Sequence, residues 1–172
     1  MVSTEFLPTV TDVNPSAWRG RVPVAALAII GCGIASYLAL YQLGLVAHVV
    51  DPLFGSRSSE AVITSPLSRA LPIPDAALGA IAYLLDATMA LIGGKARWRT
   101  DSWLVLAFGL VGAGLVVAGA GLIIVQVAVV HAGCTLCLAS AALSFTNGWL
   151  SRSEVGAALH HVRRNNERGS KS

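Results

Sequence analysis

The motif Cys134-Thr135-Leu136-Cys137 opens an apolar segment that continues to Leu150. Two thiols at positions i and i+3 in the first turn of a helix lie on one face, close enough to form and break a disulfide. The start of a helix also favours the thiolate form of a cysteine. The spacing therefore predicts a redox pair, and the alternative is two small apolar residues packed in a helical bundle.

Other chemistry fits this motif less well. No third or fourth ligand is near the pair, which makes it a poor zinc site, and Leu138 stands where a haem attachment signal needs histidine. We predict no metal site. The chain has three cysteines, too few for a disulfide-stapled scaffold, so a bridge here is more consistent with catalysis than with structure. The third, Cys32, lies inside an apolar stretch and is interpreted as an inert small hydrophobe.

The composition is that of an integral membrane protein. Of the 172 residues, 55% are hydrophobic and 12% are charged, and the mean hydropathy is +0.68. The net charge of +3 raises the question of nucleic acid. However, the basic residues are neither interleaved with aromatics nor gathered on one amphipathic helix, so we expect no nucleic-acid partner.

Four apolar segments predict an all-α membrane protein with a four-transmembrane-helix bundle, and they are residues 22–50, 76–93, 103–130 and 134–150. Residues 51–75 are broken by prolines and are predicted to form a short cap between the first two helices, with Asp75 as the N-cap of the second. Asp86 lies deep in the second segment and should face the interior and find a partner. Gly109, with Ala113, forms one of two small-residue pairs that permit close helix contact.

The predicted domain organisation has three parts. Residues 1–20 are expected to be a disordered tail, residues 21–150 the membrane domain, and residues 151–172 a flexible basic tail. Of the twelve Lys and Arg residues, only Arg57 and Arg69 lie in the 51–75 cap, and the other ten fall on the side of the two termini. This asymmetry predicts cytoplasmic termini and an extracytoplasmic cap and motif. All four tryptophans fall at the predicted cytoplasmic boundary, which agrees with that orientation.

Residues 22–150 resemble a bacterial member of the vitamin K epoxide reductase family. The similarity is carried by Cys134-Thr135-Leu136-Cys137, Ser59-Glu60-Ala61-Val62-Ile63-Thr64-Ser65-Pro66 and Ile73-Pro74-Asp75-Ala76-Ala77-Leu78-Gly79-Ala80-Ile81-Ala82-Tyr83. The resemblance implies a four-helix bundle that encloses a quinone of the menaquinone or ubiquinone type. It places Cys137 next to the quinone ring and Cys134 in exchange with a thiol donor. It also implies quinone-binding roles for Asp75, Ser65 and Leu78.

The chain departs from the family pattern at several positions. Members usually carry two cap cysteines that relay electrons from a thioredoxin-like partner, but Ser59 occupies the later position and residues 51–75 contain no cysteine. Electrons would therefore reach Cys134 directly from an extracytoplasmic partner protein or a small thiol. Asp75 stands where the family has a quinone-bonding asparagine, and a carboxyl donates a hydrogen bond only when protonated. Ala141 replaces an aromatic hydroxyl.

We therefore predict a membrane oxidoreductase of the bacterial plasma membrane that couples dithiol–disulfide exchange at Cys134 and Cys137 to reduction of a bound quinone. His131 could assist the thiolate, although an interfacial role is its ordinary explanation. One alternative is a non-catalytic quinone- or lipid-binding protein derived from the family, which the missing cap cysteines favour. Another is a membrane scaffold that uses the small residues of 103–130 as its contact face.

Overall fold

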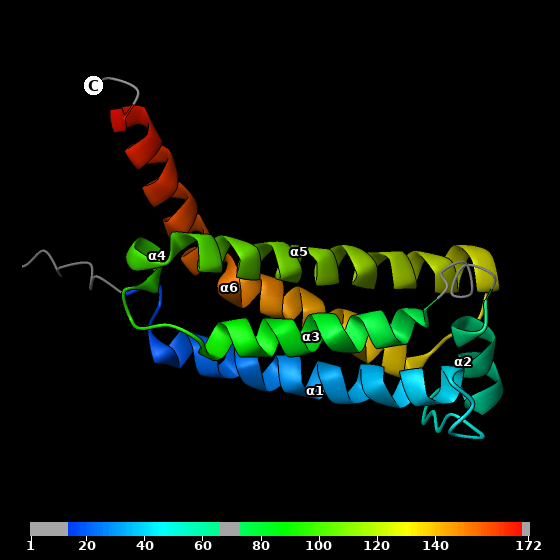
Figure 1. Ribbon diagram of the computed structural model, residues 1–172. Coiled ribbons are helices and arrows are strands. Elements are labelled where there is room, and N and C mark those ends of the chain that lie inside the picture. The colour runs from blue at the N-terminus through cyan, green and yellow to red at the C-terminus, as the bar shows by residue number, and fades with distance from the viewer. Residues whose placement is uncertain (1–13, 66–72, 170–172) are drawn as a thin grey trace, which may run out of the picture.

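The computed structural model describes residues 14–65 and 73–169, and these residues are helical with no strand among them. The helices are α1 (Trp18–Gln42), α2 (Ser56–Ile63), α3 (Asp75–Leu91), α4 (Arg97–Thr100), α5 (Ser102–Ile124) and α6 (Thr135–Gly169), with a π-helical segment, Val125–Val130, after α5. Figure 1 shows α1, α3, α5 and α6 running side by side along the molecule, with α2 at one end and α4 at the other.

The prediction of an all-helical protein is confirmed. Two helical stretches, Trp18–Gln42 and Ser102–Val130, are long and apolar enough to cross a membrane, with mean hydropathies of 2.0 and 2.5. Helix α3 has 17 residues, slightly fewer than a full crossing normally needs. Helix α6 starts apolar and continues into a polar, basic segment. A crossing by all four long helices therefore stays a prediction.

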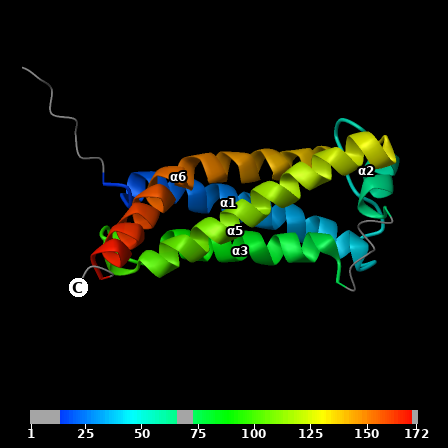
Figure 2. The same cartoon turned by 90° about the horizontal axis from the view of Figure 1, so that it is seen from above.

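Small residues allow the long helices to approach closely. In the view of Figure 2, α5 runs at an angle across the other long helices. A Cβ added at Gly119 of α5 would lie 3.1 Å from the backbone of Ala141 in α6. A Cβ at Gly109 would lie 2.8 Å from Val155, so this predicted small residue does sit at a helix contact. The α1–α3 pair uses the same device, because the ring of Tyr83 occupies the space that a side chain at position 31 would need.

The first helix is shorter than predicted. It ends at Gln42, whereas the apolar pattern extended to residue 50. Gly44 has a φ of 75°, and Leu45 N–H donates to the carbonyl of Leu40 at 2.9 Å. These are the features of a glycine-terminated helix, in which the left-handed residue closes the last turn. Leu43 and Leu45 after it are exposed, and they lie in the loop that leads to α2.

The residues assigned to the two tails are partly helical where the structure describes them. Residues 1–13 lie outside the described range, but Ser16 is fully buried and α1 already begins at Trp18. At the other end, α6 does not stop near residue 150 and runs unbroken to Gly169. Glu154 and Ala158 on this extension are buried. These two positions pack the first part of the extension against the bundle, whereas residues 162–168 are exposed.

A buried ion pair fastens the end of the bundle that holds both termini. The guanidinium of Arg97 donates to both carboxylate oxygens of Glu154, at 2.6 and 2.7 Å, and Ser16 Oγ donates to the same carboxylate at 2.5 Å. Arg21 donates to three carbonyls at the end of α3, at 2.6 to 2.8 Å. Arg21 and Arg97 are two of the ten basic residues in the predicted charge asymmetry. Their interior hydrogen bonds show that they also stabilise the packing at this end of the bundle.

Candidate active site

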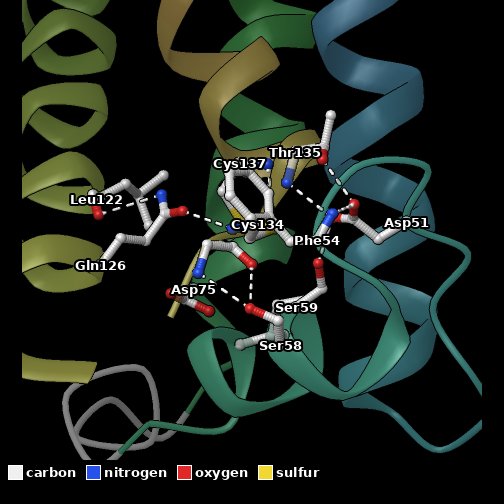
Figure 3. The surroundings of a disulfide bond; sticks show 12 residues. Asp51, Phe54, Ser58, Ser59, Asp75, Leu122, Gln126, Cys134, Thr135 and Cys137 are labelled. Carbon is white, nitrogen blue, oxygen red and sulfur yellow. Dashed lines mark hydrogen bonds between the residues drawn. A yellow bond between two sulfur atoms is a disulfide. The ribbon is translucent and has the colours of Figure 1, made fainter. Parts of the chain in front are cut away.

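The two cysteines of the motif lie at the start of α6 and are joined by a disulfide, with their Cα atoms 5.2 Å apart. Both are buried, and Cys134 has no exposed surface. The backbone N–H of Cys134 donates to Gln126 Oε1 at 2.7 Å, so the segment before the motif is held by the end of the preceding helix (Figure 3). The predicted proximity of the two thiols is therefore confirmed.

Asp51 from the loop before α2 caps the first turn of α6. Its carboxylate accepts hydrogen bonds from the N–H of Thr135 at 2.7 Å and from its hydroxyl at 2.6 Å, and others from Ser59 Oγ and the N–H of Phe54 (Figure 3). Burial opposes ionisation, but these hydrogen bonds outweigh it and lower the pKa of Asp51 below its usual value. A charged carboxylate from a distant loop thus serves as the helix cap.

The cap also closes over the motif from outside. Ser58 Oγ donates to the carbonyl of Gly133 at 2.7 Å and accepts from its N–H at 2.9 Å. The ring of Phe54 lies against Gly133, where an added Cβ would come within 2.6 Å of it. A side chain at position 133 would therefore collide with the Phe54 ring, and on this side the cap covers Cys134 completely.

A cavity of about 740 Å³ lies on the inner side of the disulfide. Its walls are mostly apolar and come from α1, α2, α3, α5 with the segment after it, and α6. Cys137 lines the cavity, as do two of the predicted quinone contacts, Asp75 and Leu78. The third, Ser65, is buried next to α2 but is not among the described residues that line the cavity. The sequence thus placed three of these four side chains on one cavity.

Asp75 differs from its predicted role in local structure. It is the first residue of α3, after Pro74, and no side-chain cap precedes the helix. Gln42 at the end of α1 donates to Asp75 Oδ1 at 2.5 Å and to the carbonyl of Ile63 at 3.1 Å. The pair therefore forms a polar end of the cavity where α1, α2 and α3 meet. Gln42 was not identified from sequence, although its amide is a polar group in an apolar stretch.

Tyr83 is a second polar group that the sequence analysis missed. It lines the cavity from α3, and its hydroxyl donates to the carbonyl of Ser140 at 2.6 Å and pairs with Ser144 Oγ at 2.7 Å. Ala141, where an aromatic hydroxyl was expected, lines the same cavity. A usable signal existed, because Tyr83 follows Asp75 by eight residues, which places both on one face of a helix.

The remaining candidates fall outside this cavity. Asp86 is buried and accepts a hydrogen bond from Asn147 Nδ2 at 3.1 Å, which confirms the prediction that it faces inward with a partner. His131 is exposed, with a left-handed φ of 52°. Cys32 is half-buried, with its sulfur 4.0 Å from Ser36 Oγ. The described residues contain no cluster of side chains suited to a metal ion.

The chain matches a model of a known protein family. A family model described as the vitamin K epoxide reductase family matches residues 22–151, which covers every helix wall of the cavity and the disulfide. No curated protein matches the chain.

Proposed function

The chain belongs to the vitamin K epoxide reductase family, and from that premise we propose that it couples thiol–disulfide exchange at Cys134 and Cys137 to the reduction of a quinone. Family membership and the disulfide support membrane thiol–disulfide oxidoreductase chemistry in general. The proposal adds the acceptor and the residue roles. It also includes four membrane crossings by residues 21–150 and cytoplasmic termini, an orientation that the distribution of Lys and Arg supports. A bacterial plasma membrane is proposed from the family resemblance alone.

The observation that carries the proposal is the position of the disulfide between two environments. Cys137 lines the cavity, while Cys134 is covered by the cap on the opposite side. In such an arrangement one sulfur faces the acceptor and the other faces the donor. We assign Cys137 to the step at the acceptor and Cys134 to exchange with an extracytoplasmic dithiol, either a thioredoxin-like protein or a small thiol.

The cavity suits a quinone ring in size and chemistry. Ligand cavities typically measure about 300–1,000 Å³ and combine apolar walls with a few polar groups. Here the polar groups stand at two places, the Asp75–Gln42 pair and the Tyr83 hydroxyl. Asp75 can donate to a carbonyl oxygen of the quinone when protonated, and Tyr83 can do so only when its single hydroxyl proton turns away from the Ser140 carbonyl that it binds here. Leu78 contributes apolar wall, and Ser65 is assigned to the support of the α2 end, because it is buried there.

Reduction of an acceptor in the cavity requires both sulfurs of the pair. The reduced pair gives up two electrons as the sulfur–sulfur bond forms between Cys134 and Cys137. A donor dithiol then reduces that bond again, and the donor becomes a disulfide. A menaquinone- or ubiquinone-type ring supplies the two-electron acceptor when bound.

The test is anaerobic mixing of reduced protein with ubiquinone and menaquinone analogues, followed by quinol absorbance. Cys137→Ala should abolish quinol formation, and Cys32→Ala, which changes the one cysteine outside the disulfide and outside the cavity lining, should leave the rate unchanged. Equal rates in Cys137→Ala and the parent would rule out the proposed role.

A second candidate is a non-catalytic quinone- or lipid-binding protein. It is favoured by the closed cover over Cys134 and by Ser59, which is hydrogen bonded to Asp51 and cannot relay electrons. Alkylation of membranes with and without prior reduction separates the two functions. A pair that is labelled only after reduction is a redox couple, whereas thiols that are labelled without a reductant favour a binding role.

A further inference from the structure

The inward face of α6 carries buried polar side chains along much of its length. They are Cys137, Ser140, Ser144, Asn147 and Glu154, each at most 8% exposed. The spacing of three, four, three and seven residues keeps them on one helix face. Tyr83 and Asp86 of α3 are opposite them and are equally buried. Polar groups at such depth in a membrane protein are costly, and they commonly mark ion or proton routes.

Two hydrogen-bonded pairs connect α3 to α6 in the middle of this row. Tyr83 pairs with Ser144 at 2.7 Å, and Asp86 pairs with Asn147 at 3.1 Å. Both helices advance by three residues from the first pair to the second, which is about 4.5 Å along a helix axis. The Tyr83–Ser144 pair lines the cavity, and the Asp86–Asn147 pair lies directly behind it. The two pairs are therefore consecutive along the facing sides of α3 and α6.

Two polar atoms on this face of α6 are buried without a hydrogen-bond partner in the described part of the chain. Ser140 Oγ and Asn147 Oδ1 are buried and have no hydrogen-bond partner within the described residues. Ser140 lines the cavity, one turn along α6 from Cys137. A buried polar atom without a hydrogen-bond partner destabilises the fold, so these two atoms call for an explanation.

Among the described residues, no cation forms an ion pair with Asp86. Its neighbours are the Asn147 amide from α6, the backbone of Gly112 in α5, and Tyr83 on its own helix. From α1, the carbonyl of Val24 binds the same Asn147 amide, at 3.2 Å. The guanidinium groups toward the cytoplasmic end belong to Arg21 and Arg97, and they bind the end of α3 and Glu154. A carboxylate buried without a cation is costly, whereas a protonated carboxyl has a proton to give.

We propose that Asp86 supplies a proton to the quinone through Tyr83 and Ser144, an inference that rests on the proposed function. The attacking Cys137 is a thiolate, so its own proton has already left for the solvent. The Cys134 thiol, the Cys137 thiolate, the protonated Asp86 and the quinone become a disulfide, the ionised Asp86 and the quinol. Two electrons leave the sulfurs, and two protons, one from Cys134 and one from Asp86, reach the quinol oxygens. Asp86 regains its proton from water.

The experiment is single-turnover reduction of a ubiquinone analogue by reduced, purified protein across a pH series in H₂O and D₂O. General acid catalysis typically contributes about 10²–10⁴-fold, so Asp86→Asn should slow the reaction about 100-fold. The parent rate should rise with pH as the thiolate forms and fall again as Asp86 ionises. Asp86→Asn should lose the falling limb and the solvent isotope effect, and Asp86→Glu should restore both.

Three results would overturn the proposal. One is an Asp86→Asn rate and pH profile that match the parent. Another is equal slowing in Asp86→Asn and Asp86→Glu with the falling limb intact, which indicates a packing role. The last is Tyr83→Phe with an unchanged isotope effect. Each of these requires a parent that reduces quinone. A parent that leaves the quinone oxidised would instead defeat the proposed function, and the proton route with it.

Discussion

Removal of the Asp51 carboxylate should open the cover over the disulfide. Of its hydrogen bonds, the two with Thr135, at 2.7 and 2.6 Å, join the cap directly to α6. Hydrogen bonds to a charged group contribute about 1.5–3 kcal/mol each. Asp51 is only half-buried, so we take the lower value for each of the two bonds. Asp51→Ala should then reduce the free energy that favours the closed cap by about 3 kcal/mol. At about 1.4 kcal/mol per factor of ten, the open population should rise on the order of 100-fold.

The assay follows reduction of the disulfide by a water-soluble phosphine in nanodiscs, with maleimide labelling of the released thiols read by mass. Cys134 has no exposed surface, so the rate should track the fraction of open cap. Asp101→Ala is the matched control, because Asp101 also stands at the start of a helix, α5, but at the opposite end of the bundle. Similar reduction rates in Asp51→Ala and Asp101→Ala would refute this account of the cover.

The remaining predictions concern pH and packing. Because the folded pKa of Asp51 lies below its usual value of about 3.9, its contribution is complete above about pH 4 and is lost as the pH falls further. Phosphine reduction of the parent should accordingly accelerate only below about pH 4, and acceleration between pH 7 and 5 would contradict this. Gly31→Val should collide with the Tyr83 ring and destabilise the fold by about 1–3 kcal/mol. Gly33→Val faces open space and should leave the thermal midpoint nearly unchanged. Glu154→Gln should lower that midpoint by breaking the buried ion pair, at a cost of about 3–5 kcal/mol, and normal melting would argue against its role.

The sequence predicted those parts of the molecule that depend on local pattern. Apolar runs located the long helices, and the two-cysteine spacing at a helix start located the disulfide, because both follow from helix geometry. The depth of Asp86 in an apolar segment was enough to predict an inward orientation, since lipid offers a carboxyl no partner. The resemblance in residues 73–83 pointed to Asp75 and Leu78 as quinone contacts, and both line the cavity.

Features that depend on contacts between distant segments could not be predicted in this way. The sequence places Asp51 only at the start of the predicted 51–75 cap, whereas in the structure it caps a helix that starts 84 positions later. The C-terminal segment was interpreted as flexible, because its polar composition does not show that Glu154 has a buried arginine partner. Tyr83 was quoted only as part of a resemblance, since its partners lie on α6. In each case the deciding interaction joins residues that are far apart in sequence.

The presence of a single disulfide has a kinetic consequence. The chain has three cysteines, and Cys32 is not joined to the other two, so only one two-electron couple is available. Under the proposed function, the disulfide that forms when the acceptor is reduced must itself be reduced by the donor before a second acceptor can react. Donor and acceptor would therefore be served alternately, in a double-displacement cycle with parallel reciprocal plots. A reductive titration would reach its end point at two electron equivalents per chain, with no internal reserve.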